Sequence, residues 1–114
     1  MTEFPHPSSF NIDYHISKQI EIFQNLVANL TRDNYWNAVY SIDILQSLIF
    51  AKLSNEEIEK EYFQKVKKYE EELIKEHGVK ILERKGGNLN LLIALYRFDL
   101  LIRYYYKAVK KEYG

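Results

Sequence analysis

Residues 88–113 place two rows of large apolar side chains on opposite sides of one predicted helix. At about 100° per residue, each row keeps to one side of the helix, and the first falls within an arc of about 80°. The first row consists of Leu91, Leu95, Phe98, Ile102, Tyr105 and Val109. The second row consists of Leu89, Ile93, Tyr96, Leu100 and Tyr104. A helix at the edge of a bundle needs only one apolar row, so this segment requires apolar partners on two sides.

The rest of the chain repeats apolar residues at steps of three and four, the period of an α-helix, in three separate segments. Together with the last segment, they predict helices over about residues 12–30, 34–53, 55–77 and 88–113. These helices would be about five to seven turns long with short connections between them, which is typical of an antiparallel bundle. The sequence therefore predicts an all-α protein, a four-helix antiparallel bundle.

The domain organisation is simple. Pro5 and Pro7 resist helical geometry, so residues 1–10 are expected to form an irregular N-terminal leader. Residues 11–114 are expected to form a single helical-bundle domain, because 114 residues is a common size for one domain.

Local signals mark where the third and fourth predicted helices begin. Ser54 and Glu57 stand at the capping-box spacing, so the Ser54 hydroxyl is predicted to cap the third helix. The pair Gly86-Gly87 is predicted to break the chain, with Asn88 capping the fourth helix. Residues 79–87 are ambiguous between a short helical turn and an extended connector.

The segment 34–53 contains only two charged residues, Asp43 and Lys52, which raises the alternative of a membrane span. An aspartate near the middle of such a span costs about 2.5–3.5 kcal/mol, so a buried helix of a bundle fits better. We expect Asp43 to be mostly buried or interfacial. Its carboxylate then needs a partner, and we expect an arginine of the last helix or a tyrosine hydroxyl to supply it.

Composition and motifs exclude several kinds of chemistry. The chain has no cysteine, so disulfides, thiol nucleophiles and cysteine-ligated metals are absent. The three histidines do not stand at metal-binding spacings, and the sequence has neither a phosphate-binding glycine loop nor a nucleophile elbow. We therefore predict no catalytic residue, no metal and no cofactor. An enzyme site assembled from Asp43, His15 and His77 remains a third, weaker hypothesis.

Charge and the N-terminal residues bear on partners and location. Lysine plus arginine balance aspartate plus glutamate at 16 each, so no overall field draws the chain to nucleic acid or to an anionic membrane. The first residues have neither the basic nor the apolar part of a secretory signal, so a cytoplasmic protein is expected.

These observations favour a small non-enzymatic helical protein-interaction module that self-associates or docks on a protein partner through the predicted helix 88–113, with helix 34–53 as a secondary contact. Its predicted interface is the second apolar row of the last helix, since monomers seldom leave such a row in water. Two-fold pairing with a second copy would bury it, so a homodimer is expected. The connector 79–87 with Val79, Ile81 and Leu82, or the leader with Phe4 and Phe10, could cover the row instead and leave a monomer.

The alternative function is a nucleic-acid-binding accessory protein. Its binding patch would consist of Arg103, Lys107, Lys110 and Lys111, with Tyr104 and Tyr106 beside them. Cations neutralise phosphates and aromatic rings stack on bases, which is how such patches bind single strands. Cations also favour the end of a helix through its dipole, so a solvated helix terminus explains the same residues.

Overall fold

The chain folds into four α-helices, and the prediction of an all-α bundle is confirmed. The computed structural model describes residues 11–77 and 80–113, and side chains within residues 11–76 and 89–111. The helices are α1 (Ile12–Ala28), α2 (Tyr35–Leu53), α3 (Glu56–His77) and α4 (Lys80–Tyr113). No strand occurs in the described part of the chain.

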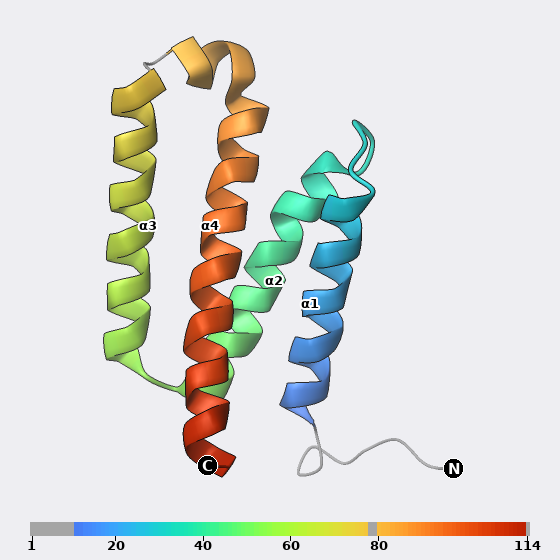
Figure 1. The fold of residues 1–114 in the computed structure, drawn as a ribbon, viewed down its shortest axis with the longest axis vertical. Helices are drawn as coiled ribbons and strands as arrows, with labels where there is room; N and C mark the ends of the chain where they lie inside the picture. Colours follow the sequence, from blue (N-terminus) through green and yellow to red (C-terminus); the bar gives the residue numbers. More distant parts are fainter. Residues whose placement is uncertain (1–10, 78–79, 114) are drawn as a thin grey trace.

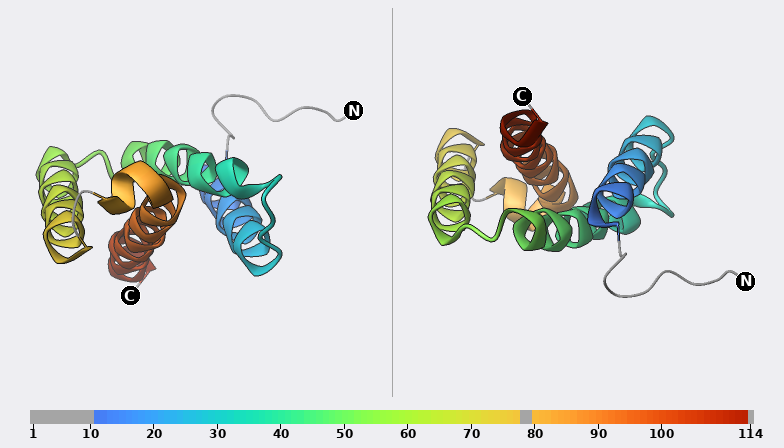
Figure 2. Two further views of the ribbon diagram at one scale, coloured as in Figure 1. Left: turned by 90° about the horizontal axis from the view of Figure 1, so that it is seen from above. Right: turned by 90° about the horizontal axis from the view of Figure 1, so that it is seen from below.

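Helix α4 occupies the centre of the arrangement. Consecutive helices run antiparallel, whereas α2 and α4 lie side by side and run in the same direction (Figure 1). Seen end-on, α4 lies between α3 and α1, on one side of α2 (Figure 2). Helix α4 therefore has neighbours on several sides, as a helix with two apolar rows requires.

Asparagine side chains define the start of α1 and the turn into α2. The Asn11 side chain accepts a hydrogen bond from the Tyr14 amide at 3.0 Å, which caps α1. In the turn, Asn34 accepts from the Thr31 amide at 2.7 Å and Thr31 accepts from the Asn34 amide at 3.2 Å. The Asn34 side chain also donates to the Asn29 carbonyl at 3.0 Å, so it ties the two helix ends together.

The predicted Ser54 cap of α3 is wrong by one residue. Asn55 is the cap, because its side-chain oxygen accepts from the amides of Glu57 at 3.0 Å and Ile58 at 3.1 Å. Ser54 instead ends α2 in the left-handed conformation, with φ 45° and ψ 49°. Its hydroxyl donates backward to the Ala51 carbonyl at 3.2 Å. The chain therefore reverses between two helices within two residues.

The predicted break at Gly86-Gly87 is also wrong, because α4 begins at Lys80 and continues through both glycines. A glycine inside a helix costs about 1 kcal/mol relative to alanine but does not prevent the helix. The first turns of α4 bend over the top of the molecule before the helix runs down beside α3 (Figure 1). Glycines are common where helices bend.

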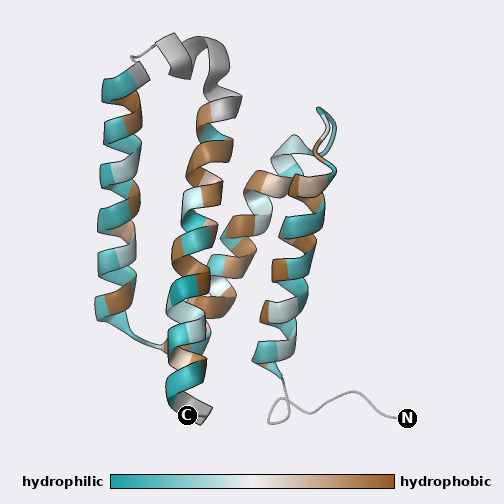
Figure 3. Cartoon of the chain, viewed as in Figure 1, coloured by the Kyte–Doolittle hydropathy of each residue, from teal (hydrophilic) through white to brown (hydrophobic). Residues whose placement is uncertain are grey.

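The core gathers where α1, α2 and α4 meet, with Tyr62 entering from α3. Figure 3 shows apolar colouring along the sides of the helices that face one another and hydrophilic colouring over much of α3 and α1. The largest fully buried side chains are Ile16, Phe23, Ile42, Leu45, Ile49, Tyr62, Leu89 and Leu101. One polar pair lies among them: the Gln19 amide donates to the Ser41 hydroxyl at 2.7 Å, which links α1 to α2.

Candidate interaction surface

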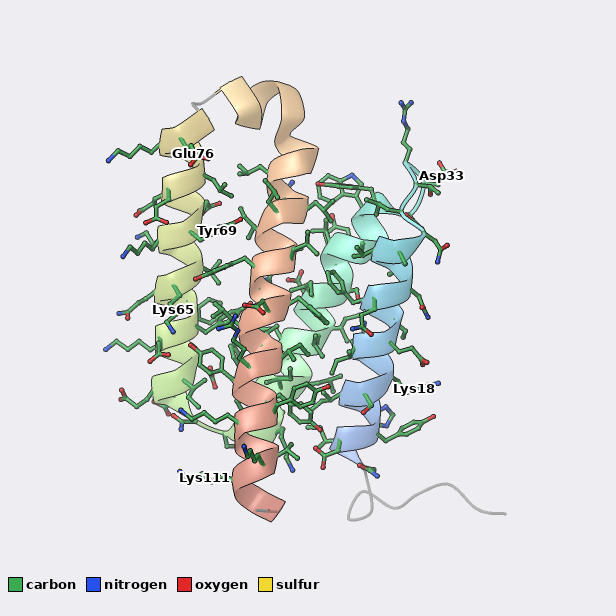
Figure 4. All side chains as sticks on the ribbon, viewed as in Figure 1. Lys18, Asp33, Lys65, Tyr69, Glu76 and Lys111 are labelled. Atoms are coloured by element: carbon green, nitrogen blue, oxygen red, sulfur yellow. The ribbon has the colours of Figure 1, made fainter. Side chains whose placement is uncertain are left out.

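The predicted interface row of α4 packs against α3 within the same chain. Leu89 is 1% exposed and Leu100 8% exposed, so neither can reach a second copy directly. Tyr96 stacks on Tyr69 of α3 with 4.2 Å between ring centroids, and Figure 4 shows Tyr69 extending from α3 toward α4. Further along, the Tyr104 hydroxyl donates to the Glu61 carboxylate at 2.7 Å.

Helix α3 is thus the cover for a row that was expected to lie at a dimer interface. The fifth member of the row, Ile93, is partly buried. The two covers considered from the sequence, the leader 1–10 and the connector 79–87, lie outside the residues whose side chains the structure describes. The oligomeric state stays a prediction, and this row no longer supports it.

Two residues of the first apolar row of α4 contact α1, whereas Leu95 of the same row is 38% exposed. Phe98 stacks on Phe23 at 4.7 Å between centroids, and the Tyr105 hydroxyl donates to the Asp13 carboxylate at 2.7 Å. Lys52 of α2 also binds Asp13, at 3.3 Å, so this carboxylate joins three helices. The two rows of α4 therefore contact different neighbours: Phe98 and Tyr105 contact α1, and Tyr96 and Tyr104 contact α3.

Arg97 lies between the two rows and connects α4 to both α2 and α3. Its guanidinium donates to the Tyr62 hydroxyl at 2.8 Å, the Asp43 carboxylate at 2.8 Å and the Gln46 amide oxygen at 2.7 Å. The predicted pairing of Asp43 with an arginine of the last helix is confirmed. Asp43 is not mostly buried, however, because its side chain is 61% exposed whereas that of Arg97 is 17% exposed.

The pKa values around Arg97 follow from this geometry. Burial alone would lower the pKa of Arg97, but the hydrogen bonds to Tyr62 and Asp43 outweigh burial, so its pKa is raised. Burial raises the pKa of Tyr62, and the bond from Arg97 offsets part of that rise. Both groups keep their ordinary charge at neutral pH, and their hydrogen bonds connect α4 to α2 and α3.

The basic end of α4 is only partly available to phosphates. Arg103 binds Asp99 at 3.0 Å on the exposed side of the helix. Lys107 and Lys111 line a groove of about 350 Å³ where α4 passes the junction of α2 and α3, with Lys111 near the end of the chain in Figure 4. The acidic Glu61 lines the same groove. Lys110 is exposed.

The residues of the weaker enzyme hypothesis do not come together. Asp43 binds Arg97, and His15 lies near the start of α1 against the ring of Tyr14. His77 is the last residue of α3, at the opposite end of the molecule in Figure 1. Among the residues that the structure describes, no three metal-binding side chains converge.

The side of α2 that faces away from α4 has large apolar side chains that are exposed to solvent. Trp36 is 48% exposed, Tyr40 57% and Ile44 54%, and each follows the last by one helical turn. The rings of Trp36 and Tyr40 stack at 5.7 Å between centroids. We define the outer face of α2 as its exposed residues other than Asp43, which binds Arg97 of α4: Trp36, Asn37, Tyr40, Ile44, Ser47 and Ala51. Within the described helix α2, none of these six residues is charged.

Two neighbouring helices extend this surface. Phe63 of α3 is 50% exposed, and its ring contacts Phe50 of α2 at 5.8 Å between centroids. Ile22 of α1 is 45% exposed and lies nearly one turn beyond Gln19, which contacts α2. The outer face of α2 therefore has an apolar side chain on each flank.

The sequence hypothesis named helix 34–53 only as a secondary contact. The signal that reveals its outer face is a second set of apolar residues at steps of four, opposite the buried row. Within residues 11–77 and 80–113, no helix has the length and apolar character needed to cross a bilayer. Comparisons with protein-family models, curated proteins and solved structures found no match to this chain.

Proposed function

We propose that the protein is a non-enzymatic helical protein-interaction module that binds a protein chain, either another copy or a different partner, in the cytoplasm. The observation that carries the proposal is the uncharged outer face of α2, where Trp36, Tyr40 and Ile44 are about half exposed. Depletion of charge and enrichment of tryptophan and tyrosine are features of interface cores.

The energy available from this face sets a requirement on the complex. Half-exposed, Trp36, Tyr40 and Ile44 offer about 300 Å² of accessible surface together. At about 25 cal/mol per Å², burying it contributes about 8 kcal/mol, against association costs of about 4–15 kcal/mol. A partner must therefore also cover the flanks, where Ile22 and Phe63 are exposed.

The alternative, a nucleic-acid-binding accessory protein, has less support. Of its four cations, Arg103 is already paired with Asp99, and Lys107 and Lys111 share their groove with Glu61. Affinity for nucleic acid grows with the number of phosphates that are neutralised. The patch offers few cations for that purpose, although Tyr106 is exposed beside it.

Site-specific photo-cross-linking tests the proposed function. A photoreactive amino acid replaces Tyr40 in one variant and Tyr106 in a control, since these two side chains are 57% and 56% exposed. In the cells that make the protein, we expect illumination to trap a protein at position 40 and not at position 106. The trapped protein is then purified, and Ile44→Glu should weaken its binding at least about tenfold. Equal adducts at both positions, or binding that Ile44→Glu leaves unchanged, would contradict the proposal.

A further inference from the structure

We infer that the occupant of the outer face of α2 is a second copy of this chain, bound across a two-fold axis near Tyr40 with the two α2 helices antiparallel. This inference rests on the proposed function and names its partner. The predicted homodimer interface is therefore no longer the second apolar row of α4, which α3 covers. It is the outer face of α2, which is exposed to solvent.

Charge favours a second copy over a different, charged partner. The six residues of the outer face carry no charge, and at its edge Asp43 is held by Arg97 at 2.8 Å. Two such faces can meet without placing like charges together, whereas a charged partner would lose hydration and gain no opposite charge. The whole chain also balances 16 basic against 16 acidic residues, so two copies do not repel each other at a distance.

The order of residues along α2 suits two-fold pairing. Trp36 and Ile44 lie one turn on either side of Tyr40. A two-fold axis at Tyr40 therefore brings the Trp36 end of one helix to the Ile44 end of the other. Each half of the contact then contains the bulky Trp36 of one copy and the smaller Ile44 of the other, which is the self-complementarity that an isologous interface requires.

The overlap of the two helices limits the size of the contact. With the axis at Tyr40, only Trp36 to Ile44 of each α2 helix face each other, which is about 12 Å at about 1.5 Å per residue. Stable interfaces bury about 800 Å² per partner, so the flanks around Ile22 and Phe63 must also take part and the dimer is expected to be weak.

Sedimentation velocity tests the inference with matched variants. Over the micromolar range, we expect the wild type to approach twice its mass of 13.7 kDa, and Tyr106→Glu to behave alike. Tyr40→Glu should stay at 13.7 kDa with unchanged helicity by circular dichroism, because it places two like charges at the axis. A wild type that stays monomeric, or a dimer that Tyr40→Glu leaves intact, overturns the inference.

Because the chain has no cysteine, single-cysteine variants report the geometry independently. With a short bifunctional maleimide, Tyr40→Cys should form a covalent dimer and Tyr106→Cys should not. Equal yields from the two variants would also overturn the inference. If the wild type is monomeric but position 40 traps a different protein in the photo-cross-linking experiment, the proposed function holds and the dimer does not. If position 40 traps nothing beyond the control, the proposed function fails as well.

Discussion

Tyr96 of α4 stacks on Tyr69 of α3 with 4.2 Å between ring centroids and 12° between ring planes. This contact shows that the second apolar row of α4 faces α3. Helix α4 also packs against α2 and contacts α1 through Phe98, so it has neighbours on three sides. The apolar character of α4 on two sides therefore follows from its central position and does not require a second chain.

A charge placed in the second row of α4 should unfold the protein and not merely separate copies. Leu100 is 8% exposed, so Leu100→Glu buries an unpaired carboxylate and should lower the free energy of unfolding by at least about 3 kcal/mol. Leu92→Glu, at a side chain 37% exposed on the same helix, should change it by less than about 0.5 kcal/mol. Urea unfolding measures both. Equal stability of the two variants would mean that α3 does not cover this row.

The Arg97 cluster should stabilise the fold far more than a surface ion pair. Arg97→Ala leaves Tyr62 and Gln46 without their donor and should cost about 2–4 kcal/mol of unfolding free energy. The control is Arg103→Ala, because Arg103 is 74% exposed and pairs with Asp99 on the helix surface. Its cost should be below about 0.5 kcal/mol. Similar losses in the two variants, measured by urea unfolding, would rule out a special role for Arg97.

The junction between α2 and α3 gives opposite expectations for adjacent residues. Asn55→Ala removes the acceptor for the amides of Glu57 and Ile58 and should cost about 1 kcal/mol. Ser54→Gly should instead stabilise by about 0.5 kcal/mol, since glycine adopts the observed φ of 45° without a steric penalty. Thermal unfolding monitored by circular dichroism should move the melting temperature in opposite directions. A lower melting temperature for Ser54→Gly would show that this conformation is not required.

The hydrogen bond from Tyr104 to Glu61 should make stability depend on pH at both extremes. Burial and the bond to Glu61 raise the pKa of Tyr104, so its contribution is complete below the ordinary tyrosine pKa near 10 and falls as pH rises further. The bonds from Tyr104 and Lys65 lower the pKa of Glu61 from 4.5, so its contribution is complete above that value and falls in acid.

Comparison of the wild type with Tyr104→Phe isolates this bond. The difference between their urea midpoints should be largest between about pH 5 and about pH 9 and should shrink toward either extreme. Tyr106→Phe controls for the loss of a phenol, because it changes the exposed residue two positions along α4. A difference between the wild type and Tyr104→Phe that stays constant from acid to alkaline pH would mean that the bond is not formed in solution.

Helical periodicity predicted most of the fold because the same spacing that places residues on one side of a helix decides which of them are buried. Ile42, Leu45 and Ile49 stand at the steps of three and four that predicted helix 34–53, and all three are fully buried. Periodicity could not show which helix covers a row, since that depends on packing between distant segments. For that reason α3 was not considered as the cover for Leu100.

Local signals were less reliable for different physical reasons. Ser54 and Asn55 are both good capping residues, and only the left-handed backbone at Ser54 decides between them. Gly86-Gly87 weakens a helix by a modest free energy, and α4 continues through it. The outer face of α2 was underestimated because Trp36, Tyr40 and Ile44 belong to a residue class that is usually assigned to the core.

Quenching of tryptophan fluorescence tests most directly whether the outer face of α2 is where two copies of this chain meet. Trp36 is the only tryptophan in the sequence, and it is 48% exposed on that face. As the protein concentration rises through the micromolar range, acrylamide should quench the wild type progressively less, while Tyr40→Glu stays fully quenchable. Quenching of the wild type that does not change with concentration and equals that of Tyr40→Glu would contradict this interface.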